Sequence, residues 1–304
     1  MIKIENTDII GWEAAIRGMR NPMNSWDNID SHYCAGPACP EDAGINLCKK
    51  ECIYYKTVAC ENNISFPYIV GPKDLELMTR LRNAGTDHRK FMRMITVYLD
   101  VTAPLYWWKE FDTYKVGTVA NSCSTMHKIA DKEFTIDDFS CEHLMSFDNS
   151  NYWEEDSDNA CFIDPSKKEV VVPASLISDY IIPMLNVARR KYNETDKKLK
   201  EAKLTETERK YLMSQKKLFW WQMIQLLPSS YNQKRTVMLN YEVLANIYKS
   251  RYNHKLDEWR IHDIPEEHKL LNKNFTSGKW GFCDWIESLP LSELITGKDK
   301  KHIF

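Results

Sequence analysis

The sequence lacks an excess of either charge. Its 304 residues hold 41 Lys and Arg against 43 Asp and Glu, which gives a formal net charge of −2 at pH 7. Proteins that bind nucleic acid or anionic membranes usually carry a basic patch or stripe. We therefore expect no nucleic-acid partner and no membrane partner. A small phosphorylated ligand needs only a few local cations and stays compatible with this balance.

A long apolar run is also missing. The best candidate, LFWWQMIQLLP at 218–228, is too short to span a bilayer and contains two glutamines. The first 18 residues do not form a signal peptide, because Glu5, Asp8 and Glu13 interrupt any apolar stretch. These absences favour a cytoplasmic protein. In that compartment the nine cysteines are more often reduced, metal-bound or buried than disulfide-paired.

Internal repeats and low-complexity linkers are absent as well, so we predict a single α/β domain over residues 1–304. Within it we expect a Cys-rich insertion at 31–62 and a helical hairpin at 175–228. The other predicted elements are, in chain order, a helix at 8–20, a helix at 71–85, a strand at 95–101, a helix that begins at Pro104, a loop at 116–128, a helix at 233–251 and a docking segment at 279–291.

Two of these predictions rest on specific local patterns. Residues 95–101 alternate between apolar and polar side chains, with Ile95, Val97, Leu99 and Val101 on one face, which indicates a half-buried strand. The second helix of the hairpin begins with Thr205 followed three residues later by Glu208, the pattern of a capping box.

The stretch MLNYEVLANIYKSRYNH at 238–254 has helical spacing but carries polar residues among apolar ones. On one helix over 233–251, Asn240 and Arg251 would lie within roughly 20° of each other, on a side shared with Leu244. Asn246 would lie on a different side. A buried Arg must find an anion or several acceptors. The alternative is that Arg251 ends the helix and offsets its dipole, and the pattern supports both interpretations.

The spacing from Leu227 onward resembles the C-terminal signature of the flavin-dependent thymidylate synthases. That signature begins with Leu-Pro and places Asn twelve residues after the Pro, a second Asn six later and an Arg five after that. The residues that match it without a gap are Pro228, Asn240, Asn246 and Arg251. A second block, 77–111, resembles the family's helix, Gly-His turn, strand and Ala-Pro-started helix. The two blocks lie in the family's order, and the resemblance covers about half the chain.

The resemblance implies a flavin-dependent thymidylate synthase-like fold, in which a twisted antiparallel sheet carries a long helical hairpin and flanking helices. It implies C5 methylation of dUMP by methylenetetrahydrofolate, with FAD as cofactor, in a homotetramer. NADPH is one candidate for the reductant, which the sequence does not identify. Arg251 would be the catalytic residue, in contact with the uracil. The other substrate-binding residues would be Glu110, Lys115, Asn121, Ser122 and Ser124, and the cofactor-binding residues would be His88, Tyr114, Lys115, Asn240 and Asn246.

The chain departs from the family where arginines hold the phosphates. Only Lys115 keeps a positive charge in the matching segment, and Glu242 stands where the family carries an Arg two residues after the first Asn. A phosphate needs cations or a cluster of N–H donors. The small polar loop at 116–125 is a candidate anion nest. Candidates to supply the missing charge are Arg17, Arg20, His127 and Lys128.

Two alternatives to methyl transfer remain. The first is a flavin-dependent dUMP hydroxymethylase, in which water rather than hydride resolves the one-carbon adduct and the product is 5-hydroxymethyl-dUMP, as a virus that modifies its DNA would need. The loss of flavin-binding arginines is compatible with this reaction. The other alternative is a non-catalytic binding protein that keeps the fold. Cys123 lies near His127, but the Pro-Cys-His sequence of cysteine-dependent thymidylate synthases is absent, so we interpret Cys123 as an unreactive thiol.

Five of the nine cysteines fall within residues 34–60. Two close pairs, Cys34 with Cys39 and Cys48 with Cys52, have a spacing that can close a tetrahedral zinc site in a loop-rich segment with little core of its own. An iron–sulfur cluster and a set of buried free thiols are the alternatives.

Overall fold

In a computed structural model of the chain, the residues described are 2–33, 68–144, 162–164, 169–171, 173–201, 203–260 and 281–297. The four cysteines predicted to bind zinc, Cys34, Cys39, Cys48 and Cys52, lie outside these residues. Within the described ranges, no helix is long and apolar enough to cross a membrane.

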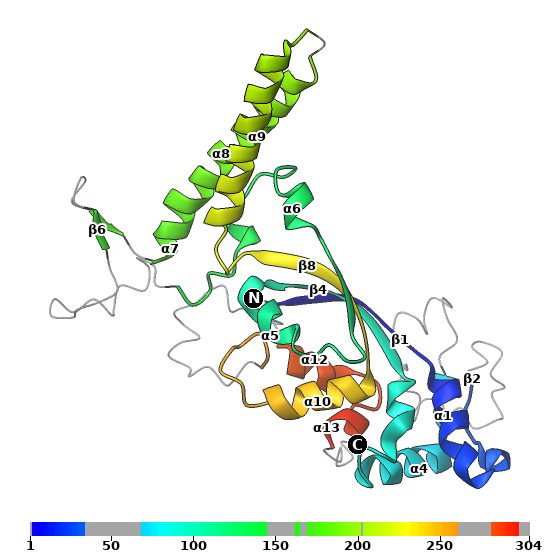
Figure 1. Ribbon diagram of the computed structural model, residues 1–304. Helices are drawn as coiled ribbons and strands as arrows, with labels where there is room; N and C mark the ends of the chain where they lie inside the picture. The colour runs from blue at the N-terminus through cyan, green and yellow to red at the C-terminus, as the bar shows by residue number, and fades with distance from the viewer. Residues whose placement is uncertain are drawn as a thin grey trace, which may run out of the picture.

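Four strands form an antiparallel sheet in the order β1-β4-β8-β5 (Figure 1). The strands are β1 (Lys3–Ile10), β4 (Thr96–Pro104), β5 (Val119–Ser122) and β8 (Asn232–Asn240). In β4 the side chains of Val97, Leu99 and Val101 are buried, while Tyr98 between them is exposed. The alternation read from the sequence is therefore confirmed, and the sheet has one face against the core and one toward solvent.

The predicted helix at 233–251 is wrong over its first half. Residues 232–240 form β8, and the helix α10 (Tyr241–Arg251) begins directly after it. Val237 and Leu239 pair with Leu99 and Val97 of β4 and bury their side chains on the same face of the sheet. Asn240 has extended backbone angles and caps α10, so it does not share a helical face with Arg251.

Two further predictions near the sheet need correction. The helix predicted at 8–20 begins only at Trp12, as α1 (Trp12–Arg20), because the residues before Gly11 form edge strand β1. Gly11 has φ +94 and lies so close to the segment before β4 that a Cβ there would be 2.1 Å from the carbonyl oxygen of Met94. The loop predicted at 116–128 contains edge strand β5 and the short helix α6 (Thr125–Lys128).

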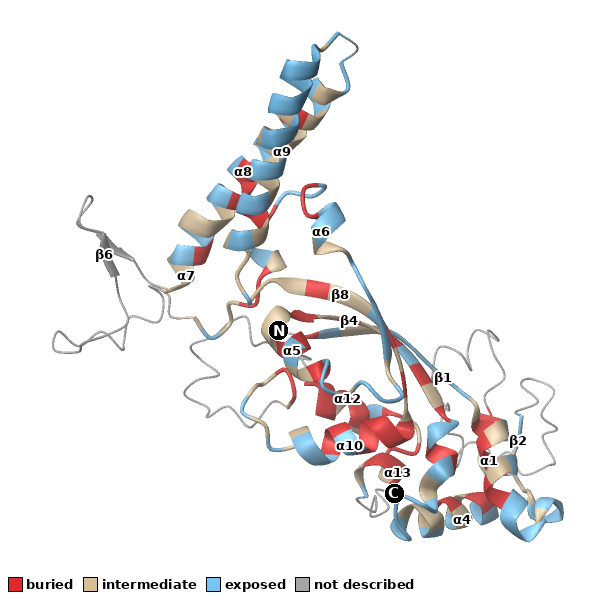
Figure 2. Cartoon of the chain, in the orientation of Figure 1, coloured by how far each residue is buried: buried red, intermediate tan, exposed pale blue. Residues whose placement is uncertain are grey.

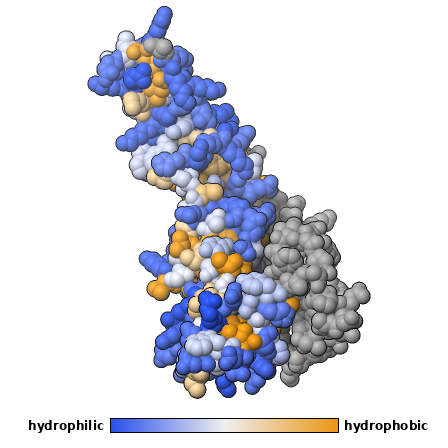
Figure 3. Space-filling model, turned by 90° about the vertical axis from the view of Figure 1, so that its right-hand side faces the viewer, coloured by the Kyte–Doolittle hydropathy of each residue, from blue (hydrophilic) through white to orange (hydrophobic). Residues whose placement is uncertain are grey.

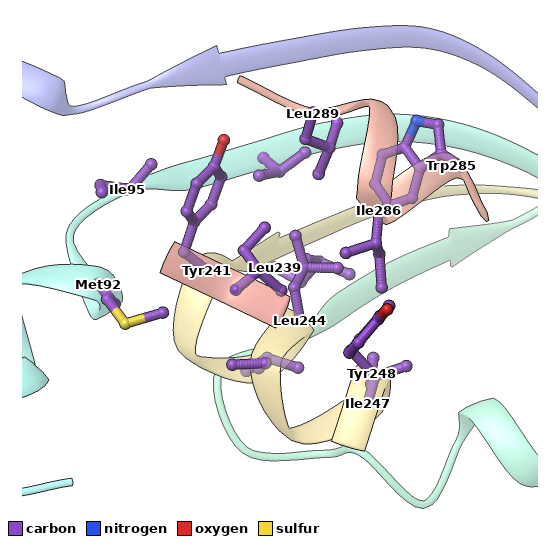
Figure 4. Packing of buried hydrophobic residues seen from close by; sticks show 14 of the residues in the cluster. Met92, Ile95, Leu239, Tyr241, Leu244, Ile247, Tyr248, Trp285, Ile286 and Leu289 are labelled. Atoms are coloured by element: carbon purple, nitrogen blue, oxygen red, sulfur yellow. The ribbon is translucent and has the colours of Figure 1, made fainter. Parts of the chain in front are cut away.

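Helices cover the buried face of the sheet. Helix α10 packs against α12 (Phe282–Ser288), α13 (Glu293–Thr296) and the 3-10 helix η4 (Arg89–Arg93). Figure 4 shows Leu239, Leu244 and Ile286 among the side chains that meet there. The predicted docking of the tail segment is confirmed, because Phe282 and Ile286 are fully buried. Helix α5 (Leu105–Phe111) begins after Pro104, as predicted.

Two long antiparallel helices project from this body (Figure 1). The π-helix η7 (Leu176–Ile181) continues into α8 (Ile182–Leu199), and α9 (Glu206–Leu226) returns. The capping box is present, because Thr205 accepts from the Glu208 N–H and Glu208 accepts from the Thr205 N–H. The helices bury Leu185 and Met223 against each other and against residues 129–139, in a second apolar cluster.

The remaining described elements are α4 (Pro72–Asn83), with 12 residues, and several shorter ones. The shorter ones are η1 (Asn21–Met23), η2 (Trp26–Asn28), β2 (His32–Tyr33), β3 (Tyr68–Ile69), η5 (Ile136–Asp138), β6 (Phe162–Asp164), β7 (Glu169–Val171) and α7 (Pro173–Ser175). The fold class is α/β, with the antiparallel sheet, helical hairpin and flanking helices that the sequence predicts.

Candidate functional site

Arg251 is the last residue of α10, and its side chain turns toward α5. Its Nε donates a hydrogen bond to the Tyr114 hydroxyl at 3.0 Å, and its Nη1 donates to Glu110 Oε2 at 2.7 Å. The guanidinium also lies 5.0 Å from the centre of the Trp259 ring. These contacts are made to side chains far away in the sequence, so Arg251 does more than offset the dipole of its own helix.

Glu110 gathers three donors on a single oxygen. Besides Arg251, its Oε2 accepts from Trp259 Nε1 at 3.0 Å and faces His254 Nε2 at 3.2 Å. The other ring nitrogen of His254, Nδ1, accepts the Leu256 backbone N–H at 3.2 Å. This bond assigns the proton of a neutral His254 to Nε2, where it points at Glu110. Three donors on one oxygen fix the direction of the Glu110 side chain.

We call these five residues the Arg251 cluster: Glu110, Tyr114, Arg251, His254 and Trp259. An aromatic layer supports the cluster from the core side. Trp259 is fully buried and packs on Trp107 with ring centres 4.7 Å apart. Trp107 and Trp108 are also buried. The Arg251 and Glu110 side chains are 18% and 32% exposed, so the cluster is open to solvent on one side.

The structure places Asn240 at the opposite end of α10 from Arg251. Its side-chain oxygen accepts the Val243 N–H at 3.0 Å, and its Nδ2 lies 3.0 Å from where a Cβ on Gly117 would stand. Eleven residues at a rise of about 1.5 Å put the two ends of the helix about 16 Å apart. Asn240 thus fixes the joint between sheet and helix. Asn246 and His88, also expected to bind the cofactor, are exposed.

The remaining predicted substrate residues lie along β5 and beside it. Lys115 is exposed between α5 and β5, and Asn121 and Ser122 are exposed on β5, which among the described strands pairs only with β8. Ser124 caps α6 by accepting the His127 N–H at 3.1 Å. The structure therefore brings together Glu110, Tyr114 and Arg251, and it holds the β5 group on a neighbouring edge of the sheet.

The structure does not support two of the suggested phosphate contacts, Arg20 and the middle of the loop at 116–125. Arg20 is 5% exposed and forms a double contact with Asp74, through Nε and Nη2, both at 2.7 Å. Residues 119–122 form an extended strand whose partner is β8. The middle of the candidate loop at 116–125 is therefore extended and is not the compact turn that an anion nest requires. Arg17 and His127 are exposed, and Lys128 pairs with Asp131 at 2.9 Å.

Sequence reasoning did not assign Trp259 or His254 to the site. Trp259 stands in the charged segment around 257–260, and no local pattern marks it. His254 follows Arg251 by three residues and directly precedes Lys255. The turn after α10 brings His254 rather than Lys255 to Glu110.

No group of residues in the described ranges could hold a metal ion. The described cysteines are free thiols: Cys123 is exposed, Cys141 is half-buried and Cys283 is buried. Burial raises the pKa of the Cys283 thiol to about 12, which keeps it protonated and unreactive at neutral pH.

Comparisons with known proteins give structural likeness only. No protein-family model matches the chain, and no curated protein sequence does. Among solved structures, one similar chain is thymidylate synthase X (ThyX) from Helicobacter pylori with FAD and dUMP, with a TM-score of 0.45, 12% identity and 98% of each chain covered. A second ThyX structure from Helicobacter pylori, also with FAD and dUMP, gives a TM-score of 0.41 and 13% identity over 90% of this chain and 98% of that one.

Proposed function

We propose that the chain is an enzyme resembling the flavin-dependent thymidylate synthases, which transfers a one-carbon unit from methylenetetrahydrofolate to C5 of dUMP. One observation carries the proposal. Arg251 belongs to one block of the resemblance, and Glu110 belongs to the other, 141 positions away, yet their side chains are hydrogen-bonded at 2.7 Å. The two blocks thus converge on one cluster that contains the arginine expected to contact uracil.

Arg251 is the residue that would act on the ring. A carbon nucleophile at C5 requires electron density to move through the ring, and negative charge then develops on a ring carbonyl oxygen. A guanidinium N–H directed at that oxygen stabilises the charge. Glu110 and Tyr114 hold the guanidinium in place before the ring arrives, so no reorganisation is needed when the charge develops. The ring of Tyr114 offers an aromatic face against which a flat heterocycle can stack.

The FAD implied by the resemblance carries a diphosphate, and three arginines around the sheet do not fit it. Arg20 is bound to Asp74, Arg89 to Glu242 at 2.9 Å, and Arg235 to Asp112 at 2.8 Å. Each of these cations already has a carboxylate partner, so it adds little net attraction for a phosphate. We therefore assign steps only to the chain's own residues.

This charge pairing favours hydroxymethyl transfer as a second candidate. Methyl transfer requires a hydride once the one-carbon unit is attached to C5, whereas hydroxymethyl transfer requires only water at the same point. A site with a weakened flavin-diphosphate contact would still support the second reaction. Both candidates use Arg251 in the same role.

The test is an assay of purified protein with dUMP and methylenetetrahydrofolate, with and without FAD and NADPH, followed by the mass of the nucleotide product. A methylated product that depends on FAD and NADPH supports the first reaction. A hydroxymethylated product formed without reductant supports the second. A protein that makes neither product would contradict the proposed enzyme.

Arg251→Lys tests the role of the guanidinium. Lysine keeps the charge but lacks the planar, fixed fork of N–H donors that contacts Tyr114 and Glu110 and leaves a further N–H for the ring, so we expect the rate to fall by about 100- to 1000-fold. The matched control is Arg260→Lys, because Arg260 also pairs with a carboxylate, Glu287 at 3.1 Å, and stacks on a tyrosine, Tyr252 at 3.8 Å. Equal losses in the two variants would show that Arg251 acts only in the fold.

A further inference from the structure

Helix α5 contacts the segment after α10 at two places that lie one helical turn apart. The Tyr106 hydroxyl donates a hydrogen bond to the carboxylate of Glu258. One turn later, Glu110 accepts from Trp259 Nε1 at 3.0 Å. Because Tyr106 and Glu110 are four residues apart, they lie on the same face of α5. Two successive side chains of the segment, those of Glu258 and Trp259, are therefore bound to one helix face.

Glu258 is a buried carboxylate outside the Arg251 cluster. Its exposed fraction is 3%, and a carboxylate at such a position is costly unless hydrogen-bond donors reach it. Burial raises the pKa of the Tyr106 hydroxyl well above its usual value, and the Glu258 carboxylate raises that pKa further. The hydroxyl therefore stays protonated at neutral pH and acts as the donor. This contact fixes the Glu258 side chain relative to α5.

The start of α12 holds the backbone of the same two residues. The N–H of Phe282, the first residue of α12, donates to the Glu258 carbonyl at 2.8 Å. The next N–H, that of Cys283, donates to the Trp259 carbonyl at 2.7 Å. The approach is so close that a Cβ on Gly281 would be 2.8 Å from the carbonyl carbon of Trp259. Residues 258 and 259 are thus bound through their side chains to α5 and through their backbone to α12.

Trp259 carries this fixed position into the cluster, because it touches both members of the Arg251–Glu110 pair. Its Nε1 donates to Glu110, and the guanidinium of Arg251 lies 5.0 Å from the centre of its ring. A displaced indole would change both the direction of Glu110 and the surface on which the guanidinium rests. A misplacement of about 1 Å in a group that acts on the substrate can lower the rate about 100-fold.

We infer that Tyr106 and Glu258 are positioning residues, which hold the indole N–H of Trp259 on Glu110 and thereby fix the guanidinium of Arg251. They act through Trp259. The effect on the rate rests on the proposed function, whereas the effect on the Trp259 indole does not. The two effects are therefore measured separately.

The first experiment measures solvent exchange of the Trp259 indole hydrogen by NMR on the isotope-labelled full chain, with the signal assigned from its loss in Trp259→Phe. Tyr106→Phe removes only the hydroxyl, and we expect exchange at Trp259 to become at least about tenfold faster, because local opening becomes easier. The matched control is Tyr248→Phe, since the Tyr248 hydroxyl also donates to a carboxylate, that of Glu287. The control should leave exchange at Trp259 unchanged.

Two variants of Glu258 complete this experiment. Glu258→Gln keeps the shape and an acceptor oxygen for the Tyr106 hydroxyl, so exchange at Trp259 should stay within about threefold of the wild-type rate. Glu258→Ala removes the contact together with the buried charge and should act like Tyr106→Phe, which it replaces if that variant does not fold. Unchanged exchange when the contact is lost, or an equal effect in Tyr248→Phe, would overturn the inference.

The second experiment measures kcat and KM for dUMP in the product assay. We expect Tyr106→Phe to lower kcat at least about tenfold and to change KM less than about threefold, because the guanidinium acts on charge that develops only in the transition state. The double variant Tyr106→Phe with Glu258→Gln removes the hydroxyl without leaving a buried charge. A merely structural role predicts that it recovers kcat, and a positioning role predicts that it does not. If the wild-type chain forms no product, the proposed function fails, while the indole measurement still decides the inference.

Discussion

Different interactions stabilise the sheet body and the helical hairpin. Helix α10 has 11 residues and buries seven of them, from Tyr241 to Tyr248, whereas α9 has 21 residues and buries only Met223. Figure 2 shows the contrast, with buried residues concentrated in the body and exposed residues along the hairpin. Figure 3 shows that hydrophilic side chains cover most of one face of the projecting helices. Tertiary packing therefore holds α10, while α9 depends largely on local helix interactions.

Local interactions of this kind are visible along the hairpin. Thr205 and Glu208 satisfy backbone groups at the start of α9, and Lys210 pairs with Glu206 one turn away at 3.3 Å. Lys216 on α9 reaches across to Asp196 on α8. Each such contact contributes little alone. The difference teaches that substitutions in the body should act through lost packing, and substitutions in the hairpin through caps and a narrow apolar seam.

The largest effect is expected in the body, from Trp107→Ala. Trp107 is fully buried among Phe111, Trp259 and Phe282, so its removal leaves a cavity in the aromatic layer under the Arg251 cluster. We expect a loss of about 3–5 kcal/mol in the free energy of unfolding, measured by chemical denaturation. Trp221→Ala, at a hairpin position 41% exposed, is the matched control and should cost much less. Similar losses in the two variants would contradict the proposed difference between the body and the hairpin.

A smaller effect is expected in the hairpin seam, from Leu185→Ala. Leu185 is fully buried between α8 and α9. We expect a loss of about 2 kcal/mol, the low end for a buried leucine, because two helices can close around a narrow gap. Faster amide hydrogen exchange should be confined to α8 and α9. Leu218→Ala, 48% exposed on α9, should leave exchange unchanged. Faster exchange in β4 or β8 would show that the two regions unfold together.

A cap substitution acts more weakly still. Thr205→Ala removes the side chain that accepts the Glu208 N–H at 3.2 Å. We expect a loss of about 1 kcal/mol, seen as faster hydrogen exchange over the first turn of α9. Ser214→Ala removes a hydroxyl within the same helix, away from its ends, and serves as the control. An equal effect of the two would mean that the cap is not what secures the start of α9.

The smallest effect concerns acid stability on the solvent face of the sheet. Hydrogen bonds from Thr236, Asn6 and Lys234 lower the pKa of Asp100 to about 2. Because the folded pKa lies below the unfolded value of about 4, this contribution is present above about pH 4 and is lost as the pH falls toward 2. Asp100→Asn should therefore lower the melting temperature at pH 7 more than at pH 2. An equal shift at both pH values would contradict this linkage.

The sequence predicted correctly those features that depend on residues close together in the chain. The alternation at 95–101 predicted β4, and Thr205 with Glu208 predicted the start of α9, since both depend on neighbours within a few residues. The spacing from Pro228 to Arg251 led to Arg251, which lies in the cluster. These features needed no knowledge of distant contacts.

Strand β8 was missed for a physical reason. Its inward positions include Gln233 and Arg235 beside Val237 and Leu239, so the apolar alternation is present over only half the strand. Gln233 is buried because its amide donates to the Cys123 carbonyl, and Arg235 faces inward because it stacks on Trp108 at 4.2 Å. Only the tertiary structure supplies those partners. The part of the site around Trp259 was missed likewise, since 149 positions separate it from Glu110.

The direct connection of β8 to α10 at Asn240 limits the insertions and deletions that this region of the chain can accept. Strand β8 runs into α10 without a connecting loop, so one added or deleted residue in the strand would turn every later side chain of β8 to the other face of the sheet. The same change within α10 would rotate Arg251 by about 100° and carry it away from Glu110. Length is therefore more constrained than composition from β8 through α10. Substitutions can accumulate there while the distance from Pro228 to Arg251 stays fixed.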